Sequence, residues 1–112
     1  MLRDERDYIL RMIAAAAAAV ARLRERLAGG GTPAEVVQAA RAAQGELLGK
    51  DAALLRALDP ASAARMLGSD RLPAWVDLLA VEADALRADG KRDESAAIAA
   101  RATALAALKE KR

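Results

Sequence analysis

The segment from Asp4 to Ala28 is the sequence feature that most constrains the fold. Apolar residues recur in it at alternating spacings of four and three, which is the spacing of a helix that buries one face along its length. The members of this seam are Ile9, Ile13, Ala16, Val20, Leu23 and Leu27. No part of the chain shows the β-branched, alternating pattern of a strand. The sequence therefore predicts an all-α protein.

A second stripe lies beside this seam on the same helix and consists mainly of alanine. Its members are Leu10, Ala14, Ala17 and Ala21. A helix with an apolar seam on one side and an alanine stripe on the other is apolar around much of its middle. We therefore expect that neighbouring helices or a second copy of the chain cover both sides.

Glycines and prolines divide the rest of the chain into further helices. The glycines of residues 29–31 should end the first helix, because glycine adopts the left-handed conformation of a helix end without steric cost. The segment "TPAE" that follows has the spacing of a capping box, with Thr32 as the N-cap and Glu35 three residues later. A second helix should therefore extend to about Leu48.

Two short helices are expected over residues 51–68, the second of them capped by Asp59. A fifth helix should begin near Pro73, and a sixth should run from about Asp93 to Lys109.

A chain of 112 residues is normally one domain, so we assign residues 1–112 to a single helical unit. We expect about six helices, arranged as two antiparallel hairpins (residues 4–48 and 73–109). The short helices of residues 51–68 should join the two hairpins.

The expected last two helices meet at "RADGKRDESAA", residues 87–97, which combines a charged helix end, a glycine and a helix start with small residues. The residues that recur at helical spacing on both sides are Leu79, Ala83, Leu86, Gly90, Ser95, Ala99, Ala102 and Leu105. In this pattern the C-terminal hairpin resembles one tetratricopeptide repeat. About three repeats are needed to build a peptide-binding groove, so we favour a closely packed corner of a bundle over the alternative, a repeat that binds a peptide.

A wider pattern combines "DYILRMI" near the start, "ELLGKDAALLRALDP" in the middle and the glycine-hinged hairpin at the end. The motif residues of the first stretch are Asp7, Tyr8, Ile9, Arg11 and Ile13. With this pattern the chain resembles a small bacterial helical family of unknown function. The resemblance implies a helical architecture over nearly the whole chain and brings no activity with it.

The residue types that carry most catalysis are missing or have another explanation. The chain has no histidine and no cysteine, and the serines Ser62, Ser69 and Ser95 lie at expected helix starts or turns. The carboxylate pair Glu82 and Asp84 is expected on a solvated helix face. The stretch "DGKRDES" lacks the alternating acids and closing glutamate of a calcium loop. We predict that the protein is not an enzyme and uses no metal or cofactor.

The charge balance argues against nucleic acid as a partner, and the shortness of the uncharged runs argues against a membrane span. Lysine and arginine number 18 against 16 acidic residues, and Glu25 lies among the clustered arginines Arg22, Arg24 and Arg26. The longest uncharged run, residues 12–21, is shorter than the roughly 20 residues that span a bilayer. The absence of cysteine suits the cytoplasm.

We therefore predict a protein–protein interaction module that self-associates through its first helix as a two-fold homodimer, and we also consider another protein as a partner. The candidate interaction residues are Tyr8, Arg11, Ala14, Ala17 and Ala21. The alternative is a regulatory domain that binds a small molecule or anion through Tyr8, Arg11 and a cleft between the hairpins. A plain ion pair between Asp7 and Arg11, four residues apart, is a third interpretation of this patch.

Overall fold

The computed structural model describes the backbone of residues 2–109. The all-α class is confirmed, because the described residues form helices and turns and contain no strand. The helices are α1 (Leu2–Ala28), α2 (Pro33–Leu48), α3 (Ala52–Ala57), α4 (Pro60–Leu67), α5 (Leu72–Ala88) and α6 (Arg92–Lys109), and a 3₁₀ turn, η1 (Gly49–Asp51), links α2 to α3. Within residues 2–109, no helix combines the length and apolarity that crossing a membrane requires.

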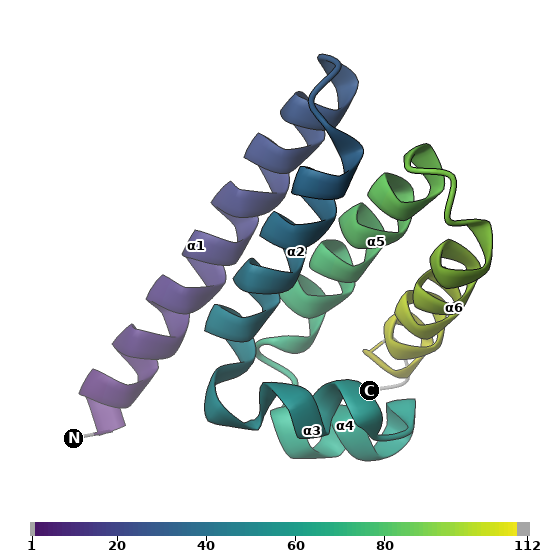
Figure 1. The fold of residues 1–112 in the computed structure, drawn as a ribbon. Helices are drawn as coiled ribbons and strands as arrows, with labels where there is room; N and C mark the ends of the chain where they lie inside the picture. The colour runs from purple at the N-terminus through teal and green to yellow at the C-terminus, as the bar shows by residue number, and fades with distance from the viewer. Residues whose placement is uncertain (1, 110–112) are drawn as a thin grey trace.

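The helices are stacked around α5. Helices α1 and α2 run side by side in opposite directions, and α5 packs against both of them. Helix α6 folds back along α5 on the side away from α1, and the short helices α3 and α4 close one end of the molecule (Figure 1). This order leaves α1 at the edge of the fold, with solvent along its outer side.

The core is centred on α5, which buries nine residues. Its large side chains Trp75, Leu78 and Leu79 are fully buried and share a cluster with residues from the short helices, including Leu55 and Leu67. Trp75 therefore anchors α5 to the short helices. Each such side chain contributes roughly 1.5–3 kcal/mol through the removal of apolar surface from water.

The apolar seam of α1 faces this core as the periodicity predicts. Ala16 and Leu23 are buried, and the other seam residues are partly buried against α2 and α5. The fully buried hydrophobic residues that α1 contributes, among its described side chains, are Ala16, Ala19 and Leu23. Only one side of this long helix is therefore covered by the rest of the chain.

The predicted N-cap positions Asp59 and Thr32 are confirmed, but the side-chain bonds of the capping box at Thr32 do not form. The Asp59 carboxylate accepts a hydrogen bond from the backbone N–H of Ser62 at 3.0 Å, and the bonds to Ser62 lower the pKa of Asp59. Thr32 makes no side-chain cap bond, and the Glu35 carboxylate instead pairs with Arg26 of α1 at 3.3 Å. The backbone N–H of Glu35 donates to the Thr32 backbone carbonyl at 3.1 Å, which takes the place of the predicted bond to the Thr32 side chain.

The turn between α5 and α6 depends on Gly90, which has a φ of 81°. The backbone N–H of Lys91 donates to the Leu86 carbonyl at 2.9 Å, as in a glycine-ended helix. On the other side of the turn, the buried Ser95 hydroxyl donates to the Ala83 carbonyl at 2.7 Å. Small side chains at these positions let the two helix backbones approach closely.

Candidate functional site

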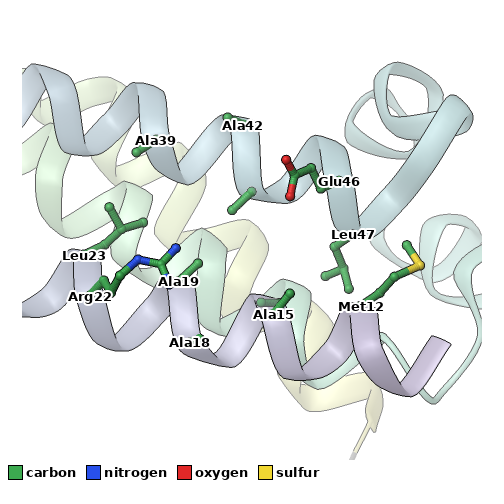
Figure 2. A pocket seen from close by; sticks show the side chains of 12 residues that line it. Met12, Ala15, Ala18, Ala19, Arg22, Leu23, Ala39, Ala42, Glu46 and Leu47 are labelled. Atoms are coloured by element: carbon green, nitrogen blue, oxygen red, sulfur yellow. The ribbon is translucent and has the colours of Figure 1, made fainter. Parts of the chain in front are cut away.

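A groove runs along the surface between α1 and α2, with α5 and α6 behind it (Figure 2). It encloses about 360 Å³ and most of its lining is alanine. The lining alanines are Ala15, Ala16, Ala18 and Ala19 of α1 and Ala39, Ala42 and Ala43 of α2. The hollow exists because methyl side chains on two adjacent helices leave the space above the helix contact unfilled.

One charged side chain lies toward each end of this groove. Arg22 of α1 lies at one end, beside Leu23, and Glu46 of α2 lies toward the other end, near Leu47 and Met12 (Figure 2). Both charged residues are exposed, whereas Leu23 and Leu47 are buried in the floor. The groove is therefore apolar in its middle and carries opposite charges toward its ends.

The predicted alanine stripe of α1 lies on a different face from the groove. Ala14, Ala17 and Ala21 are all exposed, and Leu10 is 49% exposed. The described helices therefore cover one side of α1, and the cover of its other side by a second copy of the chain stays a prediction. Only α2 and α5 pack extensively against α1, and both lie against its seam side.

The candidate residues Tyr8 and Arg11 are also exposed on α1, and Tyr8 is 57% exposed. Neither residue lines the groove, whose lining on α1 begins at Met12. The expected ion pair between Asp7 and Arg11 is wrong, because it is not among the pairs that the described side chains form. Both side chains are exposed, and an exposed pair gains too little Coulomb energy to fix two flexible side chains.

A buried ionic network is centred on Glu82 of α5 and was not predicted from the sequence. This carboxylate is fully buried and accepts hydrogen bonds on both of its oxygens. Arg41 of α2 donates from Nε to Oε2 at 2.9 Å, Gln44 donates from Nε2 to Oε1 at 2.7 Å, and Arg56 of α3 donates to both oxygens at 3.2 Å. The network therefore ties α2, α3 and α5 together through one carboxylate.

Trp75 and Arg101 extend the network toward α6. The indole Nε1 of Trp75 donates to Oε1 of the buried Gln44 at 3.2 Å. The guanidinium of Arg101 lies over the Trp75 ring, 5.4 Å from its centroid, and donates to the Leu55 carbonyl at 2.6 Å. Arg101 thereby satisfies a carbonyl near the end of α3 while it covers the tryptophan.

The electrostatics of this network keep Glu82 charged. Burial raises the pKa of Glu82, but the hydrogen bonds from Arg56, Gln44 and Arg41 outweigh burial and leave the pKa below its ordinary value of 4.5. Burial, with the nearby charge of Arg56, lowers the pKa of Arg101. A carboxylate whose pKa is lowered and whose oxygens are both occupied is a poor general base. The arrangement instead joins helices in the manner of a buried salt bridge.

The expectation that Glu82 and Asp84 share a solvated face is wrong for Glu82. The sequence does carry a signal, since Glu82 falls seven residues after Trp75 and four before Leu86, on one face of α5. A charged residue in the middle of an apolar stripe predicts a buried, paired group. The partners Arg41 and Arg56 could not be found this way, because tertiary packing brings them to Glu82.

Two arginines near the end of α1 form ion pairs with acidic residues of the same chain. Arg24 pairs with Asp84 of α5 at 3.1 Å, and Arg26 pairs with Glu35. Within residues 2–109, no group of three or more acidic side chains lies together as a metal site would require.

Comparison with protein-family models, curated proteins and solved structures found no match to this chain. The interpretation of the groove and the network rests on their geometry.

Proposed function

We propose that this chain is a non-enzymatic interaction module that self-associates through α1. The observation that carries the proposal is the uncovered side of this helix. Residues 12–21 contain no charged side chain, and the exposed members of this stretch are Ala14, Ala15, Ala17, Ala18 and Ala21. At 1.5 Å per residue, they form an uncharged surface about 15 Å long.

The exposed Ala15 and Ala18 belong to the face that α1 forms with α2, and the size of this face suits a weak dimer. Helices α1 and α2 run side by side for the 16 residues of α2, about 24 Å, and two adjacent helices are about 20 Å wide. This face therefore offers about 500 Å², compared with the roughly 800 Å² that each partner contributes to an interface of standard size. A two-fold pair is the default symmetry of such an association.

The proposal extends to the arrangement of the helices. We propose about six helices in two antiparallel hairpins joined by two short helices, with a C-terminal hairpin similar to a tetratricopeptide repeat. The buried positions of Ala83, Ser95 and Ala102 between α5 and α6 support this description. A single such hairpin serves as packing for the bundle.

The alternative, a small-molecule or anion-binding domain that uses Tyr8 and Arg11, is the weaker proposal because neither side chain lines the groove. The cytoplasmic setting and a second protein partner also stay predictions from the sequence.

Sedimentation velocity over a series of rising concentrations tests the self-association. The parent should shift from monomer toward dimer. The double variant Ala17→Glu with Ala18→Glu should stay monomeric, because it places one charge in the alanine stripe and one in the groove lining of α1. The matched control is Ala99→Glu with Ala100→Glu, two exposed alanines of α6, which should behave like the parent. A parent that stays monomeric at every concentration would contradict the proposal.

A further inference from the structure

We propose that two copies of the chain meet groove to groove in an antiparallel arrangement, in which Arg22 of each copy pairs with Glu46 of the other. The inference rests on the self-association proposed above and assigns its surface and register. The groove between α1 and α2 forms the centre of the contact between the two copies. The alanine stripe of Ala14, Ala17 and Ala21 lies outside this centre.

The first observation is that the groove carries opposite charges toward opposite ends (Figure 2). Arg22 and Glu46 are both exposed, and neither forms an ion pair with a described side chain of its own chain. In contrast, the neighbouring Arg24 and Arg26 are both paired within the chain. Each groove therefore presents one cation and one anion that are available to a partner.

The second observation is the symmetry of this charge pattern. A two-fold axis that lies in the interface and crosses the groove at its midpoint reverses the groove direction. The Arg22 end of one copy then lies over the Glu46 end of the other, and the same contact is formed twice. A parallel arrangement would place Arg22 over Arg22 and Glu46 over Glu46, so repulsion disfavours it.

The alanine lining explains why the charges can meet. Between the charged ends the exposed lining consists of Ala15, Ala18 and Ala42, whose methyl groups permit a close approach of the two copies. Burial of these methyl groups supplies the apolar part of the association. The charges at the ends then determine the register and the orientation.

Charge reversal tests this register. In the parent dimer each contact joins Arg22 and Glu46, so Arg22→Glu places two carboxylates in each contact, and Glu46→Arg places two guanidinium groups there. Each variant alone should therefore raise the dissociation constant by about tenfold or more. An equimolar mixture of the two variants should form a heterodimer with parent-like affinity, because both of its contacts join opposite charges again. Sedimentation velocity measures all four samples, and circular dichroism checks that each variant is folded.

The control is Arg87→Glu, the same charge change at an exposed arginine of α5, which should leave the dimer unchanged. Weakened single variants together with a restored mixture support the register, and misfolding cannot produce this result. A parent dimer that both charge reversals leave intact overturns the register and leaves self-association standing. A parent that is monomeric throughout overturns the proposed function and the register with it.

Discussion

Helices α1 and α5 differ both in composition and in their place in the fold, because the middle of α1 (residues 12–21) is uncharged and mostly alanine, whereas α5 combines large apolar side chains with Asp77, Glu82 and Asp84. Helix α5 lies between the α1–α2 pair and α6, and nine of its residues are buried, including the charged Glu82. Helix α1 is longer, yet solvent reaches its alanines at positions 14, 15, 17, 18 and 21. A buried charge with partners in α5 and an exposed apolar surface in α1 therefore stand in contrast.

The difference shows that the neighbours of a helix decide which of its residues are buried, whether they are apolar or charged. Glu82 is tolerated inside because Arg41, Arg56 and Gln44 occupy its oxygens. The alanines of α1 remain outside because only α2 and α5 pack extensively against that helix. An exposed apolar surface of this kind often marks an interaction site.

The largest expected effect comes from removal of the buried charge. Glu82→Gln leaves Arg56 without a carboxylate and Arg41 with only the longer contact to Glu94 at 3.8 Å, so we expect the free energy of unfolding to fall by about 3 kcal/mol, the low end for a broken buried ion pair. The low end applies because the side chains of Arg41 and Arg56 are 39% and 30% exposed. Urea denaturation measures the loss.

The matched control is Asp84→Asn, the equivalent change two residues away, where the pair with Arg24 is exposed. It should cost less than about 1 kcal/mol. Equal losses for the two variants would show that the Glu82 network does not stabilise the fold as described.

A second test compares added bulk on the two helices. Ala85 of α5 is fully buried, so Ala85→Leu should destabilise the protein by about 1–3 kcal/mol through overpacking. The same change at exposed Ala17 of α1 should alter the stability of the monomer by less than about 0.5 kcal/mol. Thermal unfolding at low protein concentration, where self-association is minimal, distinguishes the two. A large loss at position 17 would mean that α1 is covered after all.

The smallest expected effect is the pH dependence that Glu82 imposes. Because its pKa in the folded protein is below its ordinary value of 4.5, the charged carboxylate contributes stability that is fully present above that value. The contribution is lost as the pH falls through the lowered pKa. The stability difference between the parent and Glu82→Gln should therefore be constant at neutral pH and shrink in acid. A difference that grows below pH 4.5 would contradict the direction of the shift.

The helix boundaries were largely predictable because their signals are local. The periodic seam of α1, the cap at Asp59 and the glycine at position 90 each act within one or two helical turns. The capping box at Thr32 does not form, because the Glu35 N–H donates to the Thr32 backbone carbonyl and the Glu35 carboxylate lies beside Arg26 across the turn. The spacing of the motif predicts the N-cap residue but not which acceptor each N–H finds.

The sequence by itself determined the all-α class, the seam of α1 and the presence of an alanine-rich surface beside it, because helical periodicity depends on residues only three and four apart. Only the tertiary structure decided which surface stays uncovered, where Arg22 and Glu46 stand along the groove, and that Arg41 and Arg56 reach Glu82. These outcomes depend on how helices that are distant in sequence are placed side by side, and no local spacing specifies that placement.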